Sequence, residues 1–589
     1  MDRKSFIILA VAVLLLFGLS PLVDHFFPPK PAPVGVRSAL TNPPPGTAPA
    51  PVSAGLASPS PAPPPPSLVL PSRPERTLAL TNDDLILRFT SHGGGLKSIS
   101  LRKCPAVISR TADTSLAANT AVLNNKAPAP LLALLGPEAP QGDNYFDLTQ
   151  NGPVVTAEKT LPNGLRLVKE FEIGSNSLFT ARLRLENTSA QPLTLPAREV
   201  VVGTATPIGP MDDPTTLGTF WYNGLKAQDI RQAWFANRTL GCIPGTPRTV
   251  YEEGTNNVRW AAVHNQFFTI AAIPSNPAPR IVIHPVLMSP PDMVGQTNST
   301  SALLTNGLET ALWYPETNLA AHRAITGDFT FYAGPKEYNR LAKLGLQMNN
   351  NLDLIMDFSG FTGFFSKLLL LSLNGLHALG FKYGWAIIVI TLIIKGVFWP
   401  LTRSATKSQK RLQALQPQMK AIADKYKDDP VKKNQKTMEF MKEHKVSPLG
   451  SCLPTAIQIP VFIGFYYMLR GAIELRGEHF FWIHDLSQPD TVAYLPLFGG
   501  FPVNPLPLFM GATQLWQQRL LPASAGTEPG QQQVMRWLPL IFVGMFYMIS
   551  SGLVLYWTVS NLLSILQTYI TKTAEEPAKP PPPVPKKKV

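Results

Sequence analysis

The sequence predicts a polytopic α-helical membrane bundle joined to a large exported all-β domain. Of the 589 residues, 45% are hydrophobic and 15% are charged, a balance typical of membrane proteins. Long apolar segments lie at the N-terminus and in the C-terminal half, whereas residues 77–335 show the alternation of β-strands. The net charge of +14 is concentrated in two short segments beside apolar ones, as expected for cytoplasmic loops.

The chain begins with a predicted signal anchor over residues 1–27. Arg3 and Lys4 precede an apolar run from Phe6 to Val23, and no small-x-small cleavage site follows. We expect an uncleaved span whose N-terminus is cytoplasmic; a cleaved signal peptide is the alternative. Residues 28–76 form a linker, because the stretch to residue 75 contains 17 prolines and too little apolar surface to fold.

Residues 77–335 carry the pattern of a β-sandwich. Leu165–Ile173 and Phe179–Glu186 alternate apolar and polar residues on either side of a Gly-Ser-Asn turn, which predicts a β-hairpin. This domain lies between a span that leaves the cytoplasm and one that returns to it, so we expect it outside the membrane. Further strand-like runs lie at Leu85–Thr90, Glu199–Val202, Trp260–Ile273 and Ile281–His284.

The C-terminal half contains five further apolar spans, which with the anchor make six. Residues 336–382 precede them as a short helix and then an interfacial amphipathic helix at Leu352–Leu379, since charged residues and glycines interrupt that stretch. The five spans cover residues 383–401, 449–469, 494–516, 534–550 and 552–570. Between and after them lie a basic helical hairpin at 402–448, an exported loop at 470–493, a cytoplasmic loop at 517–533 and a basic tail at 571–589.

The basic segments predict the orientation of the chain. Residues 402–447 hold 12 Lys and Arg against 5 Asp and Glu (12 − 5 = +7), and residues 572–589 hold 5 Lys against 2 Glu (5 − 2 = +3). Short loops rich in Lys and Arg stay in the cytoplasm, so both termini are expected there. The tail could also meet anionic lipid or ribosomal RNA.

The hairpin at 402–448 is expected to contain two helices. Asp428-Asp429-Pro430 breaks the helical pattern, and Pro417 is expected to kink the first helix. The hairpin either merely links two spans or docks a cytoplasmic partner, and its excess charge favours docking.

The candidate site centres on Lys395, an ionisable residue within the apolar span at 383–401. Burying such a residue costs at least ~2.5–3.5 kcal/mol, so it usually lines a wet cavity or meets a partner. The other spans contain no Asp or Glu, which predicts a site that receives negative charge from outside the protein. The alternative is a lysine that snorkels to the interface. Thr391 lies one turn before it on the same helix face.

Polar residues in other spans could complete this site. Gln458 and Gln514 place amides in two of them. Hydrogen bonding between helices explains such residues about as readily as a function does. One stripe of the last span carries Trp557, Ser560, Asn561, Ser564 and Gln567.

No catalytic, cofactor-binding or metal-binding motif is found. The sequence lacks HExxH, GxSxG, Walker A and GxGxxG patterns, and its nine histidines show no ligand spacing. Cys104, Cys242 and Cys452 fit no zinc motif, although the first two could pair in the exported domain. We therefore expect no enzymatic activity, no cofactor and no metal.

Five stretches of the chain, taken together, resemble the YidC/Oxa/Alb family of membrane insertases. The likeness is strong over roughly residues 335–572 and weaker through the β-domain, where Arg259–Pro274 is similar. The stretches are Tyr332–Lys336, Tyr383–Thr402, Val446–Pro460, Trp482–Leu486 and Ser551–Leu562, in that order along the chain.

The resemblance implies a protein that inserts and folds inner-membrane proteins, alone or with the Sec translocon, without covalent chemistry. Family members use a groove, open to cytoplasm and lipid, that carries one positive residue, here matched by Lys395. Bacterial members commonly have arginine there, and lysine lacks its planar fork. Thr391 and Trp557 match groove-facing positions. The remaining candidate groove residues are Gln458, Gln514 and Asn561.

The exported domain resembles the supersandwich of Gram-negative members. This implies a multi-pass protein of the bacterial inner membrane with a periplasmic β-domain and five spans as the family's conserved core. The expected partners are nascent membrane proteins, the Sec translocon with its accessory subunits, membrane lipid, and the ribosome and targeting factors through the basic hairpin and tail.

Two other functions remain as alternatives. An anion channel or transporter could use Lys395 as its selectivity charge, but inverted repeats and paired broken helices are not found. The second alternative is a sugar-binding β-domain that the spans merely anchor in the membrane. Five spans with a buried charge are more than an anchor needs.

Overall fold

The computed structural model describes eleven stretches of the chain and divides it into two units. One unit comprises residues 1–64 and 526–538; the other comprises residues 65–525 and 539–589 and contains all the described strands. The predicted anchor, most of the linker, the tail beyond Thr573, Cys242 and Cys452 lie outside the described residues. These are 68–108, 119–136, 140–209, 212–238, 245–288, 306–358, 360–426, 429–444, 453–496, 500–520 and 529–573.

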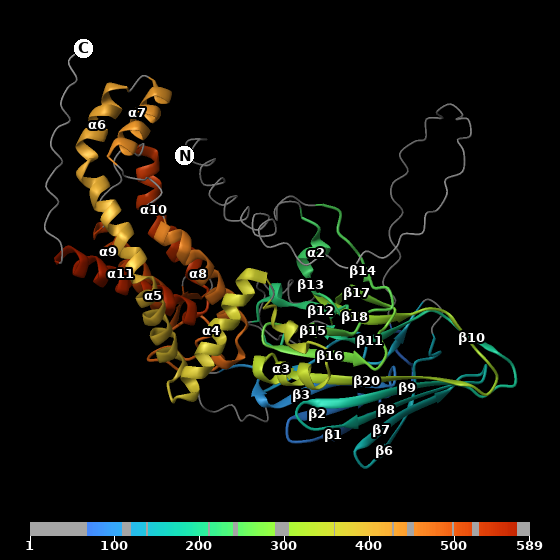
Figure 1. Cartoon of the computed structure of the whole chain (residues 1–589). Coiled ribbons are helices and arrows are strands. Elements are labelled where there is room, and N and C mark those ends of the chain that lie inside the picture. Colours follow the sequence, from blue (N-terminus) through green and yellow to red (C-terminus); the bar gives the residue numbers. More distant parts are fainter. Residues whose placement is uncertain are drawn as a thin grey trace, which may run out of the picture. The chain divides into compact units, whose positions relative to one another are not determined.

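The described residues between 77 and 335 fold into layered antiparallel sheets, as Figure 1 shows. The largest sheet has, in spatial order, β13 (Ala227–Arg231), β12 (Gly218–Tyr222), β15 (Trp260–His264), β16 (Phe268–Pro274), β20 (Ala324–Pro335), β9 (Leu178–Asn187), β8 (Leu165–Ile173), β7 (Val154–Thr160) and β6 (Asp147–Asn151). A second sheet has β14 (Tyr251–Glu253), β17 (Arg280–Leu287), β18 (Asn306–Tyr314), β11 (Arg198–Ala205) and β5 (Leu134–Leu135). Smaller sheets contain β1 (Thr77–Thr81), β2 (Leu85–Thr90), β3 (Gly95–Pro105) and β4 (Thr120–Leu123), and β10 (Leu193–Leu195) with β19 (Thr317–Leu319).

The strand pattern of the sequence explains this domain. The predicted hairpin is confirmed, since β8 and β9 pair antiparallel with Ile173 opposite Phe179. Their apolar residues point into one core shared with the other sheets, where the rings of Phe179 and Phe331 stack at 4.9 Å. Burial of such alternating side chains between sheets is the main source of stability in a sandwich.

The predicted run Trp260–Ile273 is two strands rather than one. The turn between β15 and β16 is held by Asn265, whose Oδ1 accepts hydrogen bonds from the backbone N–H of Phe267 (3.1 Å) and Phe268 (2.8 Å). Asparagine favours turns because its side chain can bond its own backbone in this way. Hydropathy alone does not reveal such a break.

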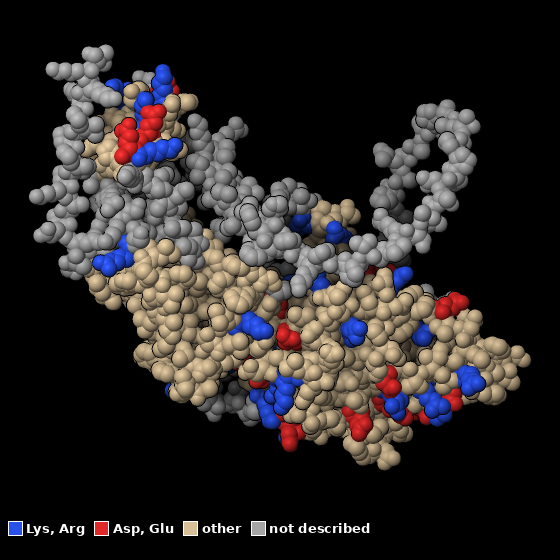
Figure 2. Space-filling view, viewed as in Figure 1, with Lys and Arg blue, Asp and Glu red and all other residues tan. Residues whose placement is uncertain are grey.

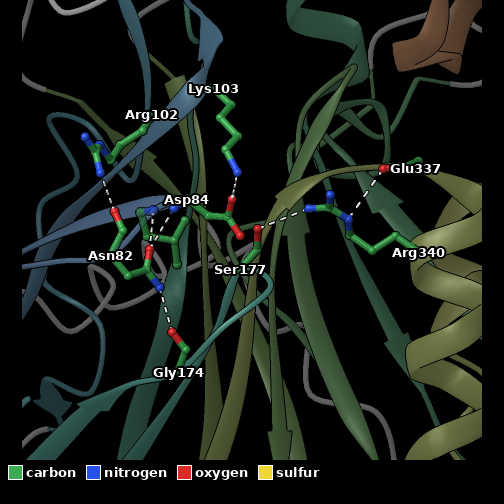
Figure 3. A network of polar contacts seen from close by, with 9 residues as sticks. Asn82, Asp84, Arg102, Lys103, Gly174, Ser177, Glu337 and Arg340 are labelled. Carbon is green, nitrogen blue, oxygen red and sulfur yellow. Dashed lines mark hydrogen bonds and ion pairs between the residues drawn. The ribbon is translucent and has the colours of Figure 1, made fainter.

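A short helix, α3 (Tyr338–Gln347), leaves the β-domain as predicted. Arg340 on α3 donates to Ser177 Oγ at 3.3 Å and pairs with Glu337 at 3.4 Å, as drawn in Figure 3. In the same view, Lys103 pairs with Asp84 at 2.6 Å within the β-domain. The Arg340 contact fastens α3 to the sheets.

The predicted interfacial helix at Leu352–Leu379 is divided in two. A 3-10 turn, η3 (Leu352–Met356), ends at Asp357, whose φ of +57° is left-handed, and α4 (Gly360–Ala378) follows. The hydroxyl of Ser366 on α4 donates to the carbonyl of Gly464 at 3.0 Å. Because a Cβ at Gly464 would meet Phe365, this close packing of α4 needs glycine. Whether α4 lies at the membrane interface stays a prediction.

The helices of the predicted membrane region are α5 (Tyr383–Ala414), α8 (Leu453–Gly471), α9 (Pro505–Leu520), α10 (Pro529–Phe546) and α11 (Ser551–Thr573). Among the described residues, two helices are long and apolar enough to cross a membrane, at Tyr383–Arg403 and Ser551–Ile570. The visible surface of α4 and α5 is mostly uncharged in Figure 2, and Leu392, Ile393 and Val397 of α5 are exposed.

Two predicted boundaries are corrected. The span expected from residue 494 begins as a β-hairpin, β21 (Ala493–Leu495) with β22 (Phe501–Val503), and its helix starts only at Pro505. Pro502 lies within β22, and Pro505 is the first residue of α9, where its missing N–H costs no helical hydrogen bond. The second boundary is that of the helix: α5 continues to Ala414, although its apolar stretch ends at Arg403, close to the predicted end of the span at residue 401.

The basic hairpin contains α6 (Gln416–Lys425) and α7 (Pro430–Glu443) after the end of α5. Pro417 does not kink a helix as expected; α5 ends before it, and Pro417 lies in the first turn of α6, where its missing N–H costs nothing. The predicted break before α7 is confirmed, and Asp429 caps that helix by accepting from Lys432 N at 3.0 Å.

Candidate functional site

Lys395 lies partly buried on α5, between α8 and α11. Its Nζ donates to Ser564 Oγ on α11 at 2.9 Å and lies 3.5 Å from Gln458 Oε1 on α8. Within the described part of the chain, no Asp or Glu forms an ion pair with this ammonium group. The site therefore gives the Lys395 ammonium group two hydrogen-bond acceptors without neutralising its charge.

The partners of Lys395 are themselves ordered by a second set of hydrogen bonds. Gln458 Nε2 donates to Ser560 Oγ at 2.9 Å, which orients the amide so that its oxygen faces the lysine. The hydroxyl of Ser564 donates to the Ser560 carbonyl one turn earlier, at 2.9 Å, so its oxygen lone pairs remain for the ammonium group. We call Lys395, Gln458, Ser560 and Ser564 the polar cluster.

The other predicted site residues lie near this cluster but not in it. Thr391 is fully buried and its hydroxyl donates to the Ile387 carbonyl at 2.6 Å, a bond within its own helix. Trp557 packs edge-to-face on Phe462 at 4.8 Å, and its buried indole N–H has no hydrogen-bond partner among the described residues. A buried N–H without an acceptor costs folding free energy, and the Trp557 indole therefore remains free to donate a hydrogen bond to a bound molecule.

Asn561 and Gln514 belong to the neighbouring contact between α9 and α11. Asn561 Nδ2 lies 3.4 Å from Thr513 Oγ1, and the buried Gln514 Oε1 has no partner among the described residues. The structure thus brings Lys395 and Gln458 into contact, whereas the contact of Asn561 is with Thr513 of α9. The sequence stripe contained Ser560 and Ser564, but only the structure shows that they are the residues that contact Lys395 and Gln458.

A second group of charges, missed in the sequence, lies where the β-domain meets α3. His264 Nε2 is 3.0 Å from Asp229 Oδ1, and Arg231 pairs with the same carboxylate. Burial alone would raise the pKa of Asp229, but His264 and Arg231 more than offset this and lower it. Nearby, burial lowers the pKa of Lys336 to about 8. No residue spacing in the sequence signals this group.

The C-terminal end of α8 contacts the β-domain. Arg470 Nη2 pairs with Asp213 Oδ2 at 2.6 Å, and Gln266 Nε2 donates to the Arg470 carbonyl at 2.9 Å. Arg476 donates to the carbonyls of Pro105 (2.7 Å) and Ala106 (2.8 Å). The helix that carries Gln458 is therefore held at its other end by the β-domain.

The chemistry that the described site offers is one positive charge and hydrogen bonding. Among the described residues, no group of three or more His, Cys, Asp or Glu is placed to hold a metal ion. The polar cluster offers one cation, two hydroxyls and an amide, which can bind a carboxylate or a polar backbone group.

Comparison with known proteins identifies the family. A model of the "60Kd inner membrane protein" family matches residues 375–578, and a model of the "YidC periplasmic domain" matches residues 77–371. The membrane protein insertase YidC of Syntrophus aciditrophicus (strain SB) is 30% identical, over 98% of this chain and 100% of that protein. This chain belongs to the YidC family of membrane protein insertases. The resemblance noted in the sequence is confirmed.

Other members of the YidC family match more locally. The insertase YidC of Pelobacter propionicus (strain DSM 2379 / NBRC 103807 / OttBd1) is 41% identical over 46% of this chain and 49% of its own length. A solved structure, an active YidC insertase with its first transmembrane domain resolved, covers 86% of this chain and 95% of its own with 15% identity and a TM-score of 0.34. The family is one of the inner membrane with a periplasmic domain, as the sequence predicted; the side on which each terminus lies stays a prediction.

Proposed function

We propose that this chain inserts proteins into the bacterial inner membrane and that the polar cluster receives the hydrophilic segment of the substrate. The observation that carries this proposal is the environment of Lys395, an ammonium group bonded to a serine hydroxyl and close to an amide oxygen. A charge that no described carboxylate neutralises can stabilise an acidic group on its way across the membrane.

The strength of this attraction can be bounded. A substrate carboxylate about 4 Å from Lys395 would gain up to about 4 kcal/mol at an effective dielectric constant of ~20. That is comparable with the ~2.5–3.5 kcal/mol cost of placing an acidic residue in the bilayer centre. One cation at this position can therefore offset most of the penalty for one acidic residue.

The remaining family features extend the proposal. The chain would span the membrane six times with both termini in the cytoplasm, and the substrate would enter a groove open to cytoplasm and lipid. Thr391 and Trp557, with the amides of Gln514 and Asn561, would line that groove beside Lys395. The protein would also assist folding as a chaperone, act alone or with the Sec translocon, and receive substrates from the ribosome through its basic hairpin and tail.

Charge substitutions at Lys395 test the proposal. Lys395→Arg should support insertion and Lys395→Glu should lose much of it, because the first keeps the positive charge and the second repels an acidic segment. The measurement is protease mapping of newly made membrane proteins in cells depleted of the parental protein. Substrates with acidic translocated segments should depend on the charge most.

A matched control separates a local effect from a change in total charge. Lys382, just before α5, is exposed, so Lys382→Glu makes the same charge reversal outside the apolar segment. It should leave insertion intact. Normal insertion by Lys395→Glu at equal protein level would refute a role for the buried charge.

A further inference from the structure

A tight aromatic hairpin, Phe480–Ile483, projects from the loop between α8 and α9. The backbone of Phe480 and Ile483 exchanges two hydrogen bonds of 2.9 Å each, which leaves Phe481 and Trp482 as the two residues of the turn. Their side chains are exposed, Phe481 by 72% and Trp482 by 46%. Packing inside the protein therefore does not account for the exposed part of these two aromatic side chains.

The backbone of the hairpin is strained at Phe481, the residue whose ring is most exposed. Phe481 has a φ of +52°, the left-handed region that favours glycine at the first position of such a turn. A bulky residue is a genuine outlier there. Strain of this kind persists only where the surrounding structure fixes it, and it often marks a functional surface.

The hairpin is seated on the first turn of α5. Phe480 is buried against Gly384, where an added Cβ would lie 2.2 Å from the phenyl ring. Trp385 packs edge-on to Phe480 at 5.5 Å and to Phe481 at 6.1 Å, and it is 49% exposed. Trp385, Phe481 and Trp482 thus form one exposed aromatic surface at the start of α5.

The same loop is tied to the starts of two other helices. The Trp482 indole donates to Asp490 Oδ2 at 3.0 Å, and this oxygen also accepts from Leu506 N at the start of α9 at 2.7 Å. At the start of α11, Ser551 N donates to the Gln488 carbonyl and Gly552 N to the Leu486 carbonyl. These contacts therefore fix the position of the aromatic surface along the helix axes, level with the first turns of α5, α9 and α11.

We propose that this aromatic surface is a membrane anchor that sits in the headgroup region of the outer leaflet and sets the depth of the polar cluster. Tryptophan and other aromatic residues favour that region because their rings are apolar and their edges polar. The proposal rests on the proposed function only in taking α5, α9 and α11 as membrane spans. The occupant is lipid; a protein partner is the alternative, and reconstitution in vesicles without other proteins separates the two.

The spacing along α5 gives the anchor its consequence. Ten residues separate Trp385 from Lys395 (395 − 385 = 10). At 1.5 Å per residue this is about 15 Å, half the ~30 Å thickness of the hydrocarbon core. With Trp385 and Phe481 in the headgroup region, Lys395 lies near the bilayer centre, where an unpaired acidic group of a substrate costs most.

Fluorescence quenching in lipid vesicles tests the anchor directly. A chain with Cys104, Cys242 and Cys452 replaced by serine receives one cysteine, either F481C or, as a control, L225C, which is 80% exposed on the β-domain. Each is labelled with an environment-sensitive fluorophore and reconstituted without other proteins. The F481C label should be quenched severalfold more by lipids with a nitroxide near the headgroup than the L225C label, and less by aqueous iodide. Equal quenching at the two positions would overturn the proposal, including the case in which a protein partner covers the surface.

A second experiment tests the depth. A label on I393C, which is 56% exposed two residues before Lys395, should be quenched most by a nitroxide deep in the acyl chains. In a chain that also carries Phe481→Gly and Trp482→Ser, the nitroxide depth that quenches the I393C label most should change. Since glycine suits the positive φ, Phe481→Gly alone should keep or raise the Tm, which shows that the fold is intact. An unchanged depth profile in the double variant would refute the depth role. Both readouts are independent of insertion activity, so the anchor and the proposed function can fail separately.

Discussion

Replacing Arg476 by alanine removes a contact between the segment after α8 and the β-domain. The guanidinium group donates to the carbonyls of Pro105 and Ala106 at 2.7 and 2.8 Å. It also lies over the rings of Phe267 and Phe268 at 5.5 and 5.4 Å. Burial lowers the pKa of Arg476, so desolvation offsets part of the favourable interaction.

The expected loss follows from these contacts. A hydrogen bond to a charged group contributes ~1.5–3 kcal/mol, and we take the lower value because Arg476 is only partly buried. Two such bonds give about 3 kcal/mol for the free energy of unfolding of the β-domain. Cation–π contacts contribute ~0.5–1 kcal/mol each in other proteins. We take this gain to be cancelled by the cost of removing the Arg476 guanidinium group from water.

Urea unfolding of the full chain in detergent, followed by tryptophan fluorescence, measures the effect. Arg182→Ala is a matched control, since its ion pair with Asp328 (2.7 Å) has both side chains about half exposed and is expected to contribute only ~0.2–1 kcal/mol. Cys104 gives a local readout: it is partly buried next to Pro105, and in a chain with Cys242→Ser and Cys452→Ser its alkylation should accelerate when Arg476 is lost. If Arg476→Ala costs no more than Arg182→Ala and leaves the alkylation rate unchanged, the contact does not hold the segment.

Two further outcomes are expected. Burial lowers the pKa of Lys336 to about 8, so between pH 8 and its usual value near 10.5 the unfolded chain binds more protons and stability rises with pH. Lys336→Met should raise the Tm at pH 7 and abolish that rise, and a parental chain whose Tm is flat from pH 8 to 10 would contradict the reasoning. Co-sedimentation with ribosomes should weaken as salt increases and when Lys586, Lys587 and Lys588 are deleted, because the attraction is screened. If ribosome binding is unaffected by salt and by the deletion, these charges do not bind ribosomes and act only in setting the membrane topology.

The β-domain was predictable where its strands alternate and unpredictable where they turn. The pairing of β8 with β9 follows from the period of apolar residues, because a one-residue slip would expose the whole apolar face. The break at Asn265 depends on one side chain that bonds its own backbone, so it leaves no trace in hydropathy. The β21–β22 hairpin was missed for a related reason, since its apolar residues continue the pattern of the helix that follows.

The candidate site was predictable in its charge and unpredictable in its contacts. Lys395 stands out because a lysine in an apolar span is costly wherever the helices pack. Its contact with Ser564 joins residues 169 positions apart and depends on the rotation of α5 and α11, which periodicity does not fix. The charges around Asp229 and His264 were missed because strands β13 and β15, on either side of β12, bring them together without any sequence spacing.

The two ends of α8 have different roles, and this limits what the β-domain can do in insertion. Gln458 near its start belongs to the polar cluster, whereas Arg470 at its end contacts Asp213 of the β-domain. Pro460 lies between them and removes a backbone hydrogen bond, so the two parts can bend against each other. Lys395 is also held by Ser564 of α11, and the first turn of α11 is hydrogen-bonded to the loop before α9. Loss of the β-domain contacts should therefore lower stability while the cation keeps its place. Only substitutions in the polar cluster itself should remove the charge that we propose insertion depends on.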